Sequence, residues 1–367
     1  MESKPYERVA VIGCGGWGTA LASVLATAGA ETRLWGRSDD VVAEINAKRT
    51  TPYLPGATLP AGLHASADMG AVLKRADAAM LVVPSASIRS VARQIAEYAA
   101  PGIPIAVCAK GIEAETGLLM TQVVEEELSG HPIGCVSGPT FALETALGHP
   151  TAATCAFPFA YADRLNPQTS PAARFAVTLT KESFRCYVSD DVVGVEVGGA
   201  VKNVIAIACG MMTGAGFAEN TRAALITRGL DEMKALAEAL GGRRETVTGL
   251  SGIGDLALTC SSPTSRNMSL GQQLGQGIPR SECFDGKPVV IEGEVNAKSV
   301  TDLARSVSVS MPIAETVRSI LHDGADLGTA FAALWARPLK AEPRAMDVAF
   351  SHPASSADVA KLAERIS

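Results

Sequence analysis

Short apolar runs alternate with helix-like segments along the first half of the chain. Four runs read as β-strands: RVAVIG (8–13), ETRLWG (31–36), AAMLVVP (78–84) and IPIAVCA (103–109). Segments of helical composition or spacing lie between or after them, at 19–29, 41–49, 88–99 and 118–128. Continuous apolar strands that alternate with helices are typical of a mostly parallel sheet covered on both faces. The pattern therefore predicts an N-terminal α/β domain.

The second half has a different pattern. Segments 194–212, 221–240, 292–307 and 312–322 all read as helices, and no strand is evident among them. We expect an α/β domain over 1–191, an all-α domain over 192–342, and a polar C-terminal tail over 343–367 that is weakly patterned and mobile. The proline-rich stretch 157–171 is expected to be a surface loop near the sheet edge.

Composition narrows the classes of function. The 367 residues are 47% hydrophobic and 19% charged with a net charge of −6, which excludes a disordered chain and disfavours nucleic acid as a partner. We see no uncharged apolar run long enough to cross a membrane, and the polar N-terminus does not resemble a signal peptide. We therefore expect a cytoplasmic protein that is not embedded in a membrane. The eight cysteines lack metal-like spacing and are expected to be free thiols, with no metal bound.

The strongest local motif is the glycine-rich turn after the first strand. Gly13, Gly15 and Gly18 fit the pattern G-x-G-x-x-G between an apolar strand and a helix, which is the context of a dinucleotide-binding turn. The first glycine allows the tight turn, the second allows a pyrophosphate to approach the backbone, and the third allows close packing of helix and strand. The alternative is a glycine-rich turn without a ligand.

The end of the second strand bears on the choice of cofactor. An acidic residue that binds the ribose of NAD usually stands there, but this chain has Arg37. A guanidinium suits a 2′-phosphate, so we expect NADP (NADPH) to be preferred, with NAD possible. Alternatively, Arg37 is a solvated loop residue and Asp39 binds the ribose.

Three further places carry candidate chemistry. Lys110 is either a functional cation at a strand end, where ligands of open α/β sheets bind, or an ordinary surface lysine. Lys202 lies in an apolar, glycine-rich helical segment, where it is either an acid–base group made useful by burial or a lysine that extends its ammonium to solvent. The run Ser265–Asn267 offers adjacent donors around Arg266, either for a phosphate or only as a capped loop.

A series of short runs occurs in a characteristic order over about residues 8–342. These runs are GCGGWGTALA (13–22), LWGR (34–37), YLPG (53–56), VVPS (82–85), KGIE (110–113), SGPTFALE (137–144), GVEVGGAVKNVIAIACG (194–210), AALITRGLDEM (223–233), GLSGIGDLALTC (249–260), SRN (265–267), EG (292–293), MPI (311–313) and RPLKAE (337–342). By these runs and their order, the chain resembles the bacterial type of NAD(P)-dependent glycerol-3-phosphate dehydrogenase.

The resemblance implies a fold, an activity and roles for residues. The fold would be a Rossmann-like domain followed by a helical domain like that of 6-phosphogluconate dehydrogenase. The enzyme would reversibly reduce dihydroxyacetone phosphate to sn-glycerol 3-phosphate, which supplies glycerophospholipid synthesis. Lys202 would be the catalytic acid/base. Substrate-binding positions would be Lys110, Gly138, Thr140, Asp255, Ser265, Arg266 and Asn267. Cofactor-binding positions would be Gly13, Gly15, Gly16, Trp17, Gly18, Arg37, Lys110, Ala142, Arg266, Val290 and Glu292.

Two other functions compete with this one. Another dehydrogenase with the same pair of domains would act on a hydroxy acid or a sugar nucleotide, but the Ser-Arg-Asn run argues against it. A non-catalytic NADP-binding sensor would not need Lys202 and Asp255 together with a phosphate site. We expect a small-molecule substrate and a homodimer.

Overall fold

The computed structural model describes residues 3–342 and 349–366. The chain forms two compact units, which we call the sheet unit (Met1–Gly199 with Ala237–Asp255) and the helical unit (Ala200–Leu236 with Leu256–Ser367). The division differs from the expected boundary after residue 191. The first turns of a long helix pack with the sheet, and the segment 237–255 returns to it.

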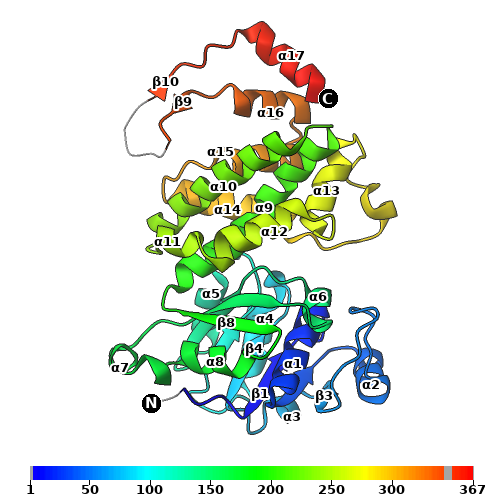
Figure 1. Ribbon diagram of the computed structural model, residues 1–367, viewed down its shortest axis with the longest axis vertical. Coiled ribbons are helices and arrows are strands. Elements are labelled where there is room, and N and C mark those ends of the chain that lie inside the picture. The colour runs from blue at the N-terminus through cyan, green and yellow to red at the C-terminus, as the bar shows by residue number, and fades with distance from the viewer. Residues whose placement is uncertain (1–2, 343–348, 367) are drawn as a thin grey trace. The chain divides into compact units, whose positions relative to one another are not determined.

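An eight-stranded sheet forms the centre of the sheet unit (Figure 1). Its order is β3-β2-β1-β4-β5-β6-β7-β8, and every neighbouring pair is parallel except β6 and β7. The strands are β1 Arg8–Ile12, β2 Glu31–Trp35, β3 Leu63–Ser66, β4 Ala78–Leu81, β5 Ile105–Val107, β6 Ile133–Ser137, β7 Thr151–Ala156 and β8 Phe184–Ser189. The predicted Rossmann-like domain is confirmed, with four strands that the pattern did not reveal.

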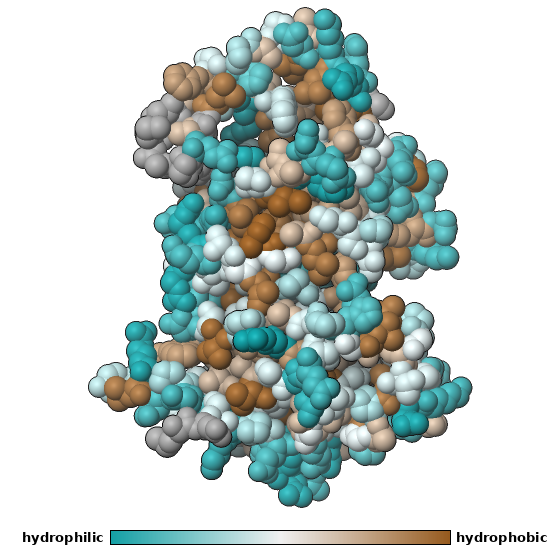
Figure 2. All heavy atoms as spheres, in the orientation of Figure 1, coloured by the Kyte–Doolittle hydropathy of each residue, from teal (hydrophilic) through white to brown (hydrophobic). Residues whose placement is uncertain are grey.

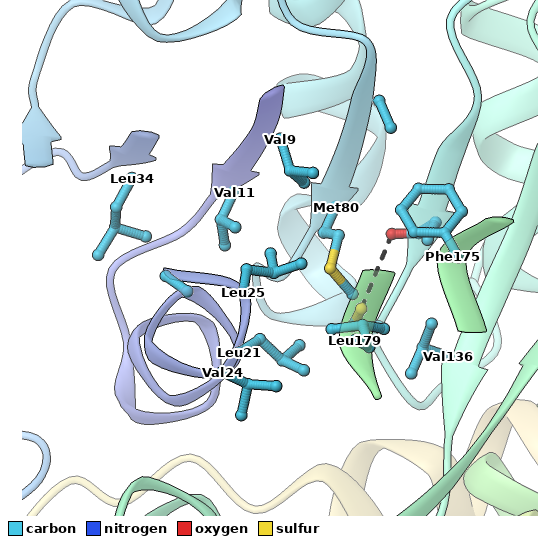
Figure 3. Close-up of a cluster of buried hydrophobic side chains, with 14 of the residues drawn as sticks. Val9, Val11, Leu21, Val24, Leu25, Leu34, Met80, Val136, Phe175 and Leu179 are labelled. Atoms are coloured by element: carbon cyan, nitrogen blue, oxygen red, sulfur yellow. Dashed lines mark hydrogen bonds between the residues drawn. The ribbon is translucent and has the colours of Figure 1, made fainter. Parts of the chain in front are cut away.

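Helices flank this sheet. They are α1 Gly16–Ala28, α2 Asp39–Lys48, α3 Met69–Leu73, α4 Ile88–Ala96, α5 Met120–Glu127, α6 Ala142–Ala146, α7 Tyr161–Leu165, α8 Pro171–Leu179 and α11 Arg244–Val247, with single turns η1 Ser85–Ser87, η2 Pro167–Thr169 and η3 Leu250–Gly254. Figure 3 shows how α1 and α8 build one core, since Leu21 and Leu25 of α1 meet Phe175 and Leu179 of α8 beside Met80 of β4. Because these side chains are fully buried, the core fixes the turns at the strand ends.

The helical unit surrounds the second part of α9. Its helices are α9 Val192–Gly214, which begins in the sheet unit, α10 Glu219–Ala239, α12 Asp255–Ser261, α13 Arg266–Gly275, α14 Glu292–Ser306, α15 Pro312–His322, α16 Leu327–Trp335 and α17 Ser356–Ile366, with the turn η4 Cys283–Gly286. α9 is long and apolar enough to cross a membrane, but 94% of its most apolar window is buried inside the protein. Small residues let α13 approach α9, because a Cβ on Gly210 would lie 2.2 Å from the Met268 carbonyl oxygen.

Three sequence predictions require correction. The stretch 157–171 is not only a loop, since it contains α7 and η2. The predicted helical domain is confirmed, but the expectation that the second half has no strand is wrong, since β9 Leu339–Lys340 pairs antiparallel with β10 Ala349–Phe350. Of the tail expected over 343–367, residues 343–348 and 367 lie outside the described residues. The remainder contains β10 and α17, and α17 packs on α16. Two-residue strands are too short to give a periodic signal, but α17 does have apolar residues at helical spacing, Val359, Leu362 and Ile366, which the interpretation of the tail as weakly patterned overlooked.

Polar and apolar side chains share the surface. The face drawn in Figure 2 carries hydrophilic residues interspersed with small hydrophobic areas, which is normal for a folded surface. The prediction of free thiols is confirmed, because all eight cysteines are unbridged and only Cys186 is not fully buried.

Candidate active site

The glycine-rich turn between β1 and α1 has the geometry of a phosphate-binding turn. Gly13 has φ of 124°, a conformation that favours glycine. A Cβ on Gly18 would lie 1.8 Å from the Gly13 carbonyl oxygen, so only glycine permits this close packing. A Cβ on Gly15 would meet nothing within 4 Å, which leaves the backbone open to a ligand. The first N–H groups of α1, from Gly16 and Trp17 onward, lack helical partners and suit an anion.

Two other predicted cofactor residues lie beside this turn. The exposed Arg37 is one of them. The residue before it, Gly36, packs directly against the turn, since a Cβ on Gly36 would lie 2.2 Å from Sγ of Cys14. On the other side α6 packs against α1, and a Cβ on Gly16 would lie 3.7 Å from Cβ of Ala142. The fold therefore gathers residues that are up to 129 positions apart in the sequence, by the difference 142 − 13.

Lys110, Gly138, Thr140 and Asp255 form a second cluster in the sheet unit. Nζ of Lys110 donates to Oδ2 of Asp255 at 2.6 Å and to the carbonyl oxygen of Gly138 at 3.2 Å. The Thr140 hydroxyl also donates to the Gly138 carbonyl oxygen, at 3.2 Å. Asp255 is only 1% exposed, so burial keeps this ion pair out of bulk water. Two strand-end segments, after β5 and β6, and the first residue of α12 thus place a cation, a hydroxyl and a carboxylate together.

Lys202 lies on α9 in the helical unit and is buried. Its side chain is 7% exposed, and its Nζ donates to Oγ1 of Thr259 on α12 at 2.9 Å. A lysine that extended its side chain into solvent would keep its ammonium group hydrated. The burial of Lys202 therefore favours the interpretation as an acid–base group over that as a solvent-exposed lysine. Thr259 itself is 2% exposed.

A chain of amides lies next to Lys202. Nδ2 of Asn203 donates to Oε2 of Glu292 at 3.1 Å, and Nδ2 of Asn267 donates to Oδ1 of Asn203 at 2.9 Å. Oδ1 of Asn267 accepts from the backbone N–H of Gly293 at 2.9 Å. The network therefore joins α9, α13 and the start of α14 and orients the amide of Asn267, which retains a second Nδ2 hydrogen.

The N-terminus of α13 carries the residues that the sequence predicts to bind a phosphate, Ser265, Arg266 and Asn267. Ser265 caps the helix, because its hydroxyl accepts from the backbone N–H of Met268 at 3.2 Å. Arg266 is the first helical residue and its side chain is exposed. A guanidinium at a helix N-terminus adds to the positive end of the helix dipole. Val290, by contrast, is 64% exposed on the segment before α14 and makes no polar contact through its side chain.

Sequence reasoning missed two residues of these clusters. Thr259 is the acceptor for Lys202, and Asn203 connects the amide chain. Both stood within runs used for the resemblance, and Asn203 directly follows Lys202. A polar residue four positions after Asp255 in a helical run was the signal for Thr259, because residues four apart share a helix face.

Two buried glutamates lie outside these clusters. Glu196 accepts from the backbone N–H and the hydroxyl of Thr121, and Glu232 accepts from the backbone N–H groups of Ile313 and Ala314. Burial raises the pKa of Glu196 to about 7 and that of Glu232 to about 8, in spite of these hydrogen bonds. Each carboxyl accepts hydrogen bonds from the N-terminus of a helix, Glu196 from α5 and Glu232 from α15. Both groups therefore titrate near neutral pH at positions where they connect parts of the fold.

Comparison with known proteins gives one consistent result. The family models of the NAD-dependent glycerol-3-phosphate dehydrogenase N-terminus and C-terminus match residues 8–161 and 191–332. A protein named glycerol-3-phosphate dehydrogenase [NAD(P)+] from Parvibaculum lavamentivorans is 44% identical over 338 residues, which are 92% of this chain and 98% of that protein. One of the same name from Caulobacter vibrioides is also 44% identical, over 92% of this chain and 99% of its own length. The crystal structure of glycerol-3-phosphate dehydrogenase from Coxiella burnetii is 38% identical, with a TM-score of 0.82 over 90% of this chain and 99% of its own.

Proposed function

Because this chain belongs to the NAD-dependent glycerol-3-phosphate dehydrogenase family, we propose that it reversibly reduces dihydroxyacetone phosphate to sn-glycerol 3-phosphate. The observation that carries the proposal is the buried Lys202 on α9, together with the ion pair of Lys110 and Asp255. The product would supply glycerophospholipid synthesis. We further propose that the protein acts in the cytoplasm as a homodimer and is not embedded in a membrane.

The glycine-rich turn supports a nicotinamide dinucleotide as the cofactor. The open backbone at Gly15 and the N-terminus of α1 suit a pyrophosphate, and Arg37 suits a 2′-phosphate, so NADPH is the preferred form. When bound, the cofactor supplies the hydride. Gly16, Trp17, Ala142, Val290 and Glu292 complete the proposed binding positions.

The residues of this chain contribute charge stabilisation and proton transfer to the reaction. Reduction of a carbonyl leaves negative charge on its oxygen, and the ammonium of Lys202 both stabilises that charge and donates the proton. In the reverse direction Lys202 accepts the hydroxyl proton. The contact with Thr259 holds the ammonium in one position, so the lysine is oriented before the substrate arrives.

The remaining residues hold the substrate. Arg266 and the N-terminus of α13 carry the bidentate and backbone donors that suit the phosphate, with Ser265 and Asn267 beside them. Lys110 and Asp255, with Gly138 and Thr140, provide donors and acceptors for the carbonyl and hydroxyl groups of the triose. Lys110 and Arg266 are the two cations proposed to contact both ligands.

The deciding experiment follows NADPH and NADH consumption after dihydroxyacetone phosphate is added to the purified protein. We expect oxidation of both, faster with NADPH at low concentration. Arg266→Lys keeps the charge but loses the two-pronged contact, so it should raise KM for dihydroxyacetone phosphate far more than for unphosphorylated dihydroxyacetone. No oxidation of either cofactor would exclude the proposed reaction and favour a binding protein.

A further inference from the structure

Arg89 on α4 makes the densest set of ion pairs in the described part of the sheet unit. Its Nε and Nη2 bind the two carboxylate oxygens of Glu113 at 2.9 and 2.6 Å. Its Nη1 donates at 2.7 Å both to Glu126 and to Glu127 of α5. The Arg89 side chain is only 24% exposed and that of Glu113 19%, so solvent screens this pair less than an ordinary surface pair.

Glu113 belongs to the segment that carries Lys110. This segment, residues 108–119, leaves the end of β5 and leads to α5. The backbone N–H of Cys108 donates to the carbonyl oxygen of Leu81 at 2.9 Å, which fixes one end of the segment to β4. Glu113 fixes it again three residues after Lys110, and its carboxylate also accepts from the Thr116 hydroxyl at 2.7 Å. Lys110 is therefore held between two anchors.

Arg89 is itself anchored close to the glycine-rich turn. It is the second residue of α4, which follows the segment 82–87 at the end of β4. A Cβ on Gly13 would lie 2.2 Å from the Val82 carbonyl oxygen, so this segment packs directly on the turn. Ile88 and Val91 of α4 are buried in the core, which leaves Arg89 little freedom to move. α4 and α5 pack side by side, as Figure 1 also shows.

We propose that Arg89, acting through Glu113, is a positioning residue that sets the place of Lys110 relative to the glycine-rich turn. The two-pronged contact restricts both rotation and translation of the 108–119 segment, as a single contact from a lysine would not. Hydrogen bonding to Arg89 also holds the pKa of Glu113 below its ordinary value, so the carboxylate stays charged in the working pH range. The proposal rests on the function proposed above for Lys110.

Arg89→Gln tests the proposal, with Arg93→Gln as the matched control. Arg93 lies one turn further along α4 and binds Glu127, so its loss removes an ion pair from the same network but none to the 108–119 segment. Because Lys110 is proposed to contact both ligands, we expect Arg89→Gln to raise KM for dihydroxyacetone phosphate and Kd for NADPH by about tenfold. The turnover number kcat should change less, because Lys110 is not the proposed proton donor. Arg93→Gln should leave KM, Kd and kcat unchanged.

Further variants separate positioning from mere stability. Glu113→Gln should reproduce the kinetic loss, and the double variant Arg89→Gln/Glu113→Gln should be no worse than either single variant, because both break the same contact. Arg89→Lys should recover part of the loss. A purely structural role would lower Tm alike in Arg89→Gln and Arg93→Gln without separating their KM values, and that result would overturn the proposal.

Three other outcomes are informative. Additive losses in the double variant would contradict action through Glu113 and indicate that Glu126 and Glu127 matter more. If Arg89→Gln does not fold, Glu113→Gln and Arg89→Lys carry the same test. If the parent protein does not oxidise NADPH with dihydroxyacetone phosphate, the proposed function fails, yet NADPH binding by fluorescence still decides whether Arg89 positions Lys110.

Discussion

The two units build their functional groups in different ways. The sheet unit relies on backbone at strand ends, where Gly13, Gly15 and Gly18 shape a turn and Gly138 presents a carbonyl oxygen to Lys110. The helical unit relies on buried polar side chains that reach from one helix to another, as Lys202 does to Thr259 and Asn267 to Asn203. The tightly packed glycines of the backbone site, Gly13 and Gly18, leave no room for a Cβ, whereas the side-chain site depends on the chemistry of its polar groups and tolerates a change that keeps their shape only if it also keeps that chemistry. The predictions that follow test this difference.

The largest effect is expected in the helical unit, from Lys202→Met. Methionine keeps the length and the helix propensity but removes the ammonium, so the fold should persist. The turnover number should fall by about 10²–10⁴-fold if Lys202 donates the proton, while NADPH affinity should stay near that of the parent. Turnover at saturating substrate and NADPH binding by fluorescence measure both. Near-normal turnover would move the acid/base role to Lys110 or Asp255.

The sheet unit should respond to single methyl groups. In Gly18→Ala the new Cβ would lie 1.8 Å from a backbone oxygen, so the turn must open, at a cost of about 1–3 kcal/mol in the free energy of unfolding and a clear loss of NADPH affinity. Gly15→Ala is the matched control, since its Cβ meets nothing within 4 Å. Gly15→Ala should leave Tm unchanged and weaken only the binding of NADPH. Equal Tm values for the two variants would contradict the geometry of the turn.

Arg37→Asp tests the one side chain that we expect to select the cofactor in the sheet unit. The substitution turns attraction to a 2′-phosphate into repulsion. The affinity for NADPH should therefore fall by about tenfold more than the affinity for NADH, which corresponds to roughly 1.4 kcal/mol. Titration of each cofactor against the variant checks this. Asp39→Asn covers the alternative, because a selective loss of NADH there would show that Asp39 binds the ribose.

The smallest effect is a pH dependence of stability from the two buried glutamates. Burial raises the pKa of each in the folded protein, so the folded state holds the proton more tightly than the unfolded chain. The stabilisation is fully present in acid, below the ordinary glutamate pKa. It is lost as the pH rises to about 7 for Glu196 in the sheet unit and about 8 for Glu232 in the helical unit.

Glu196→Gln and Glu232→Gln should each flatten the decline of stability, by at most about 1.4 kcal/mol per pH unit. Tm measured from mildly acidic to mildly alkaline pH provides the slope for the parent and both variants. Glutamine lowers the absolute stability by presenting an N–H group to a backbone donor, so the comparison concerns slopes only. Unchanged slopes would indicate that neither carboxyl is protonated in the folded protein at neutral pH.

Much of the sheet unit was predictable because its elements have local signals. Val9 and Val11 alternate with other apolar residues in β1, and the glycines that follow mark the turn. β8 was missed because it has an exposed, irregular pattern, with Tyr187 and Val188 both near half exposed. β7 was missed because its small residues, Thr151–Ala156, give a weak strand signal. An edge strand with one covered face lacks the continuous apolar run of a central strand.

The sequence by itself determined the residue chemistry and those local elements of this protein that have a strong periodic signal. It placed the glycine-rich turn after a strand, Lys202 in an apolar helix, and Ser265 before a helix that it caps. Only the tertiary structure decided which of these groups meet. Lys110 contacts Asp255, which lies 145 positions further along the chain, and Arg89 contacts Glu113 on a neighbouring segment. Such contacts depend on the packing of whole elements around a shared core, and no local pattern of residues records that packing.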